Sequence, residues 1–270
     1  MRHSISRWLG SALPLAALAG CAHAPARPAL GANARYVAMG SSFAAGPGIP
    51  EPVATPAARC GRSTNNYAHQ FARMRGLTLV DVTCSGATTA HILGPWNELA
   101  AQLDALTPDT ALVTVTIGGN DVNYVGSLMN ASAGREIQPP TNEAWERLAQ
   151  SFDRIAAEVH RRAPGARLVF VDYLSLLPNG QPCAGTPVSP EQAEKLRRTA
   201  RHLEEATAAA ASRAGAGLIR ASALSREHDV CDAEPWTTGY AAEERGPVPY
   251  HPNRDGMRAV AQALDASLPR

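Results

Sequence analysis

The strongest constraint on the fold is the alternation of short β-favouring runs with longer segments of helical periodicity. Five runs rich in aliphatic and β-branched residues cover residues 35–39, 77–82, 111–117, 167–171 and 217–220. Segments with helical spacing of apolar residues cover 66–75, 96–106, 142–162, 190–214 and 253–268. Strands that alternate with helices of this length form βαβ units. The sequence therefore predicts an α/β fold, a three-layer α/β/α sandwich around a central parallel five-stranded sheet.

Composition excludes several classes of protein. The chain has 270 residues, a length that α/β folds often occupy as a single domain. Its 25 basic and 24 acidic residues leave a formal net charge of +1, so no nucleic-acid partner is expected. Lys195 is the only lysine and is followed by Leu196, which excludes a P-loop and disfavours a Schiff-base enzyme.

The N-terminal segment has the pattern of an export signal. Arg2 and Arg7 precede an apolar run over residues 8–18, which is too short to span a membrane. The run ends in Leu18-Ala19-Gly20-Cys21, which resembles the lipobox of bacterial lipoproteins. We therefore expect a signal peptide over 1–20, a lipidated Cys21 with an Ala/Pro-rich tether over 21–34, and one domain over 35–270. The chain would then be exported and lipid-anchored to the cell envelope, at the outer membrane or cell surface. The alternative is an ordinary signal peptide with an incidental cysteine.

The cysteine count also favours export. Without Cys21, four cysteines remain, an even number that allows three disulfide connectivities. We favour Cys60–Cys84 and Cys183–Cys231, because each pair closes a loop of moderate length. A metal site that uses the segment 228–232, which contains a histidine, two aspartates and a cysteine, is the alternative. No C-x-x-C or H-E-x-x-H spacing accompanies it, so we expect neither a metal nor another cofactor.

Four short polar blocks follow predicted strands or precede the last predicted helix. They are Gly40-Ser41-Ser42, Cys84-Ser85-Gly86, Gly118-Gly119-Asn120-Asp121 and His251-Pro252-Asn253. In parallel α/β sheets, ligands bind at the carboxyl ends of the strands, where the first three blocks are expected. Each block alone is also typical of an ordinary turn or helix cap.

In their order and strand context, the four blocks resemble the SGNH hydrolase family, also called GDSL-type esterases and lipases, from about Tyr36 to the end of the chain. The resemblance implies a flavodoxin-like SGNH hydrolase fold and cleavage of carboxylic esters. It implies that Ser42 is the nucleophile and His251 its general base. The oxyanion hole would consist of the backbone N–H groups of Ser42 and Gly86 and the side-chain amide of Asn120.

The chemistry requires these residue types. A serine hydroxyl is a poor nucleophile at neutral pH, so a neutral imidazole must accept its proton during attack. The tetrahedral oxyanion then needs preorganised donors, each worth about 10² to 10³ in rate. Glycine at position 86 allows the backbone to approach the substrate closely.

The sequence departs from the family at two positions. Ser41 stands where the family has aspartate, and Val248 stands where most members carry the aspartate that orients the histidine. The backbone carbonyl of Val248 is our preferred orienting group. A carboxylate from elsewhere is the second possibility, and a histidine without a partner is the third. The candidate carboxylates are Asp229, Asp232, Glu243 and Glu244.

The sequence thus predicts a serine ester hydrolase that acts on acyl or acetyl esters of lipids, small molecules or glycans. Cys60 and the Cys84 block resemble the secreted, disulfide-bearing branch of the family, whose members include enzymes for longer acyl chains. Two alternatives remain: a polysaccharide O-acetylesterase, with tryptophans stacked on sugar rings, and a catalytically silent ligand-binding lipoprotein of the same fold. We expect a monomer whose partners are the ester substrate and, through Cys21, a membrane.

Overall fold

The protein is described here from a computed structural model, which describes residues 1, 30–53, 58–241 and 248–269. Each of the five predicted runs forms a strand. The strands are β1 (Arg35–Gly40), β2 (Thr78–Asp81), β3 (Thr110–Thr116), β4 (Arg167–Val171) and β5 (Gly217–Ile219). They pair in the order β2-β1-β3-β4-β5, and every pair is parallel. The predicted α/β class and five-stranded parallel sheet are therefore confirmed.

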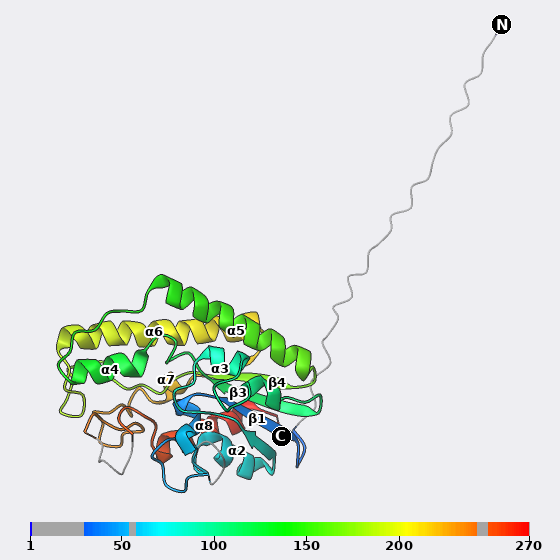
Figure 1. The fold of residues 1–270 in the computed structure, drawn as a ribbon, viewed down its shortest axis with the longest axis horizontal. Helices are drawn as coiled ribbons and strands as arrows, with labels where there is room; N and C mark the ends of the chain where they lie inside the picture. The colour runs from blue at the N-terminus through cyan, green and yellow to red at the C-terminus, as the bar shows by residue number, and fades with distance from the viewer. Residues whose placement is uncertain (2–29, 54–57, 242–247, 270) are drawn as a thin grey trace.

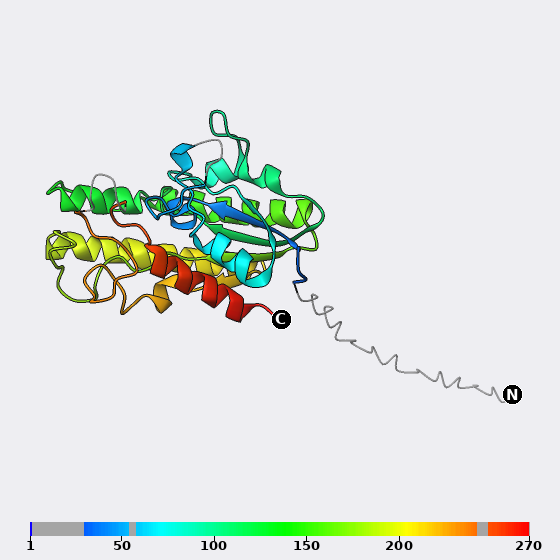
Figure 2. The same ribbon diagram turned by 90° about the horizontal axis from the view of Figure 1, so that it is seen from below.

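Helices cover both faces of the sheet. The α-helices are α1 (Ser42–Ala45), α2 (Tyr67–Arg75), α3 (Thr89–Leu93), α4 (Tyr124–Ser132), α5 (Asn142–Arg162), α6 (Pro190–Arg213), α7 (Ala221–Leu224) and α8 (Arg254–Ser267). In Figure 1, α5 and α6 lie above the sheet and α2 and α8 below it. Figure 2 shows α8 beside α2.

The pattern of β1 explains why both faces are covered. Successive side chains of a strand point to opposite faces. Val37 and Met39 therefore pack in the core under α3 to α6, whereas Tyr36 and Ala38 pack in the core with α2 and α8. All four side chains are fully buried. An apolar run with no polar alternation thus becomes a central strand of a sheet covered on both sides.

One predicted helix is wrong. In place of a helix over 96–106, Trp96 and Leu99 form an isolated antiparallel bridge, and only a 3-10 turn, η2 (Gln102–Ala105), follows. Asn97 has a φ of 53°, the left-handed conformation of a tight turn, so the chain reverses there and cannot continue a right-handed helix. The sequence analysis also did not predict the helices α3, α4 and α7.

Residues 2–29, which hold nearly all of the predicted signal peptide, Cys21 and most of the tether, lie outside the described residues. Within the described part of the chain, no helix is long and apolar enough to cross a membrane. The same part contains the disulfides Cys60–Cys84 and Cys183–Cys231.

Candidate active site

Ser42 lies at the turn that follows β1, an interior strand of the sheet. Gly40 ends the strand with a φ of 145°, a conformation that side chains rarely adopt, and a Cβ there would collide with the carbonyl oxygen of Thr116. Glycine therefore allows β1 to reach its last pairing with β3, after which the chain turns into α1. Ser42 is the first residue of α1, which ends at Gly46 in the left-handed conformation.

His251 meets Ser42 across 209 residues of sequence. Its Nε2 atom lies 2.8 Å from the Ser42 Oγ. Both residues are largely buried, Ser42 with 7% and His251 with 9% of its surface exposed. Thr238 holds the main chain of the histidine, because its N–H donates to the His251 carbonyl at 2.9 Å and its Oγ accepts the His251 N–H at 3.2 Å. The two residues that the sequence nominated for catalysis are thus brought within hydrogen-bonding distance.

The carbonyl that faces the other ring nitrogen belongs to Pro249. His251 Nδ1 lies 2.7 Å from the Pro249 oxygen. The prediction of Val248 is therefore wrong: its carbonyl accepts the hydroxyl of Thr238 at 2.5 Å. The difference has a local cause. Tyr250 adopts a left-handed conformation, with a φ of 57°. The chain turns at this residue, and the carbonyl of Pro249 therefore contacts the imidazole ring of His251.

Two of the carboxylates considered as alternative partners of His251 make hydrogen bonds elsewhere. Asp229 accepts the N–H of Cys231 at 2.8 Å, and Asp232 accepts the N–H of Asp229 at 2.8 Å, so both belong to their own loop. Glu243 and Glu244 lie outside the described residues. In the described residues, no carboxylate is hydrogen-bonded to the imidazole of His251.

The tautomer of His251 follows from these partners. A carbonyl oxygen can only accept a hydrogen bond, so Nδ1 carries the proton and Nε2 presents its lone pair to the Ser42 hydroxyl. Burial lowers the pKa of His251 below its ordinary value, and the hydrogen bond to Pro249 opposes this shift. The imidazole is therefore neutral at neutral pH and able to accept a proton.

The second and third sequence blocks are joined directly. The Asn120 side chain donates one N–H to the carbonyl of Ala87 at 2.8 Å, which leaves its other N–H for a different acceptor. Gly86 has a φ of 83°, which explains the glycine at this position. Asp121 accepts the N–H of Thr89 at 3.1 Å and also its hydroxyl, so this carboxylate anchors the start of α3.

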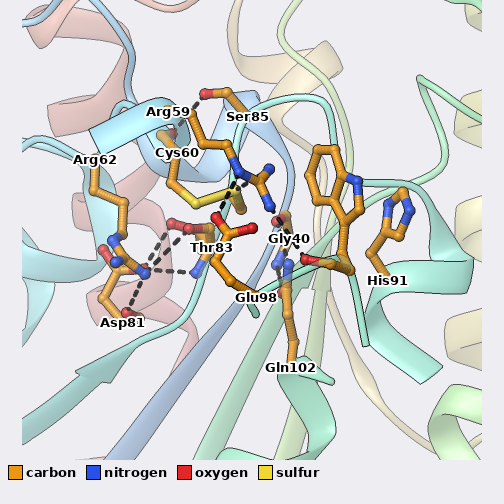
Figure 3. Close-up of a disulfide and its surroundings, with 12 residues drawn as sticks. Gly40, Arg59, Cys60, Arg62, Asp81, Thr83, Ser85, His91, Glu98 and Gln102 are labelled. Carbon is orange, nitrogen blue, oxygen red and sulfur yellow. Dashed lines mark hydrogen bonds and ion pairs between the residues drawn. A yellow bond between two sulfur atoms is a disulfide. The ribbon is translucent and has the colours of Figure 1, made fainter. Parts of the chain in front are cut away.

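Gln102 fixes the strand end that precedes Ser42 (Figure 3). Its side-chain oxygen accepts the N–H of Gly40 at 2.7 Å, and its side-chain nitrogen donates to the carbonyl of Gly40 at 3.0 Å. That carbonyl also accepts the N–H of Cys84 at 3.0 Å. Gln102 is 5% exposed and was not predicted by the sequence analysis, because it acts on backbone atoms 62 residues away.

A stack of side chains lies beside the Cys60–Cys84 disulfide (Figure 3). The guanidinium of Arg59 lies 4.1 Å from the centre of the Trp96 ring, and the imidazole of His91 stacks on the same ring at 4.1 Å. The indole thus lies between a cation and an imidazole. A Cβ on Gly86 would lie 3.2 Å from this indole, so Trp96 packs closely on the glycine of the second block.

In the segment 228–232, which was considered as a metal site, the cysteine and the histidine have other partners. Cys231 is in a disulfide, and His228 stacks on Trp236 with its Nδ1 2.9 Å from the carbonyl oxygen of Glu234. Among the residues that the structure describes, no three histidine, cysteine or acidic side chains form a group that could hold a metal ion.

A parallel sheet with a buried serine–histidine pair at the carboxyl end of an interior strand is typical of serine hydrolases. Comparison with known proteins narrows this class. The family described as GDSL-like Lipase/Acylhydrolase matches residues 38–259. Lipase 2 of Streptomyces coelicolor is 35% identical over an alignment that covers 91% of this chain and 88% of that protein. The chain belongs to the GDSL-like lipase/acylhydrolase family and is a carboxylic ester hydrolase.

Two solved structures share the fold. Phospholipase A1 from Streptomyces albidoflavus superposes with a TM-score of 0.73 at 22% identity, covering 87% of this chain and 99% of that one. The extracellular lipase from Streptomyces rimosus gives a TM-score of 0.73 at 24% identity, with coverages of 86% and 98%.

Proposed function

We propose that the chain cleaves carboxylic esters through an acyl-enzyme in which Ser42 is the nucleophile and His251 the general base and acid. The single observation that carries the proposal is the 2.8 Å contact between His251 Nε2 and Ser42 Oγ, with Nδ1 held by the carbonyl of Pro249. A buried pair with a fixed tautomer is prepared for proton transfer before the substrate arrives.

The proposed reaction has two halves. The Ser42 oxygen attacks the ester carbonyl while its proton moves to His251 Nε2, and the resulting imidazolium returns this proton to the leaving alkoxide as the C–O bond breaks. An alcohol leaves and an acyl group stays on Ser42. A water molecule then attacks the acyl-enzyme, gives its proton to His251, and releases the acid as the proton returns to Ser42.

The oxyanion of each half-reaction would bind the backbone N–H groups of Ser42 and Gly86 and the side-chain amide of Asn120. The Ser42 N–H starts a helix and so has no acceptor within it. The Gly86 N–H has no backbone acceptor among the described residues. Asn120 also lines a groove of about 560 Å³ that extends between α3 and α5, into which the substrate could continue.

The proposed substrates are acyl esters of lipids or of small molecules. This assignment is supported by the 35% identity to a protein named Lipase 2 and by the two lipolytic enzymes that share the fold. The first test is labelling of the purified soluble part, from residue 22 onward, with a fluorophosphonate probe and mapping of the labelled peptide. We expect labelling at Ser42 and none in Ser42→Ala. Folded protein that resists the probe would refute the mechanism and favour a silent binding protein.

A second assay defines the acyl group. Rates with 4-nitrophenyl esters from acetate to palmitate, with Ser42→Ala as the control, would rank chain lengths. We expect butyrate or longer esters to exceed acetate in kcat/KM. A marked preference for acetate, together with acetate release from acetylated polysaccharides, would favour the O-acetylesterase alternative.

We further propose that the protein is exported, lipid-anchored through Cys21 and monomeric. The two disulfides support export, since such bonds persist in oxidising compartments. Radiolabelled palmitate should enter the full chain, and Cys21→Ser should abolish this incorporation and release the protein from membranes. Unchanged labelling in Cys21→Ser would overturn the anchor. Light scattering of the soluble part should give the mass of one chain.

A further inference from the structure

Tyr173 joins the two loops that carry the proposed active site. It follows β4 at the carboxyl end of the sheet and is 5% exposed. Its hydroxyl accepts the backbone N–H of Gly119 at 2.8 Å, next to Asn120. The same hydroxyl lies 3.4 Å from the Ser41 Oγ, next to Ser42. One phenol therefore contacts the neighbours of two proposed oxyanion donors.

The fit around the ring is tight. A Cβ on Gly119 would lie 2.8 Å from three atoms of the Tyr173 side chain, so only glycine allows this approach. Phe43 contacts both Tyr173 and His251, with its ring centre 4.6 Å from that of Tyr173 and 5.4 Å from that of His251. Displacement of the tyrosine would thus be transmitted to both loops and to the imidazole.

The hydroxyl is suited to a permanent structural bond. Burial raises the pKa of Tyr173 to about 12, so the phenol keeps its proton at the pH values where an esterase with a neutral histidine works. It can then accept from Gly119 and share a hydrogen with Ser41 at the same time.

We propose that Tyr173 is a positioning residue, which sets the spacing between the Asn120 amide and the Ser42 N–H by bonding both loops. The inference rests on the proposed function, because it acts through the proposed oxyanion donors. Without the hydroxyl, the buried Gly119 N–H would have no acceptor and its loop would shift to find one. A small displacement of an oxyanion donor is enough to reduce the rate.

The test is a double-mutant cycle between Tyr173→Phe and Asn120→Ala, measured with a 4-nitrophenyl ester. Tyr173→Phe keeps the ring and removes only the hydroxyl. We expect its kcat to fall about tenfold with KM within about twofold, and Asn120→Ala to lose about 10² to 10³ in kcat. The double variant should be slower than Asn120→Ala alone by only about two- to fivefold, because the tyrosine has then lost one of the two groups that it positions and keeps only its contact with Ser41.

Tyr36→Phe is the matched control. Tyr36 is also buried, and its hydroxyl lies 2.7 Å from the Thr114 Oγ, away from both loops. This variant should lose stability to a similar degree while it keeps kcat. A second variant, Ser41→Ala, should lower kcat about two- to fivefold in the wild type and not at all in Tyr173→Phe.

The outcomes separate this inference from the proposed function. If Ser42→Ala and Asn120→Ala lose activity but Tyr173→Phe keeps the wild-type kcat, the role of Tyr173 is overturned and the proposed function stands. Losses that multiply in the double variant would also overturn it, because they indicate a general structural effect. Full activity in Ser42→Ala would overturn the proposed function and this inference with it.

Discussion

Substitution of Gln102 by methionine should lower both the stability and the turnover of the enzyme. Methionine keeps the length of the side chain but removes both of its hydrogen bonds to Gly40. These bonds replace a missing strand neighbour: β2 pairs with β1 only as far as Ala38↔Asp81, so the N–H of Gly40 has no strand partner on that side. The side-chain amide completes the ladder.

The loss in the free energy of unfolding depends on which atoms lose a hydrogen-bond partner. The Gly40 N–H would be left buried without an acceptor, at a cost of about 1–3 kcal/mol. The Gly40 carbonyl keeps the N–H of Cys84, so its loss is smaller, about 0.5–1 kcal/mol. The free energy of unfolding should therefore fall by about 1.5–4 kcal/mol, which lowers the melting temperature of a domain of this size by roughly 3–16 °C.

The assay combines thermal unfolding followed by circular dichroism with kcat for a 4-nitrophenyl ester at a temperature where both proteins are folded. We expect kcat to fall at least about tenfold, because Gly40 is two residues from Ser42 and sets the direction of the chain there. Gln70→Met is the matched control. Gln70 is half-buried and donates to the carbonyl of Asn65 at 2.6 Å, so its side chain bonds a main-chain atom outside β1 and α1. Equal kcat in Gln102→Met and Gln70→Met would refute the reasoning.

Three further predictions concern titration and covalent links. The kcat/KM of the wild type should rise with pH and level off, with an inflection below about pH 6.5, because burial lowers the pKa of His251 and only the neutral imidazole accepts a proton; an inflection above pH 7 would contradict this. Burial raises the pKa of Asp172 to about 6, so its neutral form favours folding, and the wild type should lose up to about 3 kcal/mol of stability as the pH rises from 4 through 6. Asp172→Asn should lack this part of the pH dependence in urea titrations. Replacement of both Cys60 and Cys84 by serine removes a link across 24 residues and should cost about 3–4 kcal/mol in thermal unfolding.

The sequence predicts the sheet well because the strands are chemically distinctive. The run Leu168-Val169-Phe170-Val171 has no polar alternation and suits a strand covered on both faces. The segment 96–106 shows the limit of periodicity. Trp96, Leu99 and Leu103 have helical spacing, yet a turn at Asn97 and a 3-10 turn bring them to the core just as well. Spacing alone does not distinguish these solutions.

The site is predictable where its residues form short motifs and unpredictable where it depends on the backbone. Ser42 and His251 stand in recognisable blocks. The identity of the carbonyl on Nδ1 depends on the φ of Tyr250, which favours Pro249 over its neighbour. Gln102 and Tyr173 bond main-chain atoms 62 and 54 residues away, and no local pattern signals such contacts.

The two departures from the family pattern have one consequence for the proposed mechanism. With serine at 41 and valine at 248, the described residues offer His251 a carbonyl dipole and no hydrogen-bonded carboxylate. A carbonyl dipole stabilises the imidazolium of the transition state less than a carboxylate does. It also avoids the desolvation cost of burying a carboxylate in the folded protein. More of the rate acceleration must then come from the oxyanion side, where the donors act only if their loops are held in place. This requirement explains why two buried side chains are hydrogen-bonded to the main chain of these loops. Gln102 bonds to Gly40, and Tyr173 bonds to Gly119.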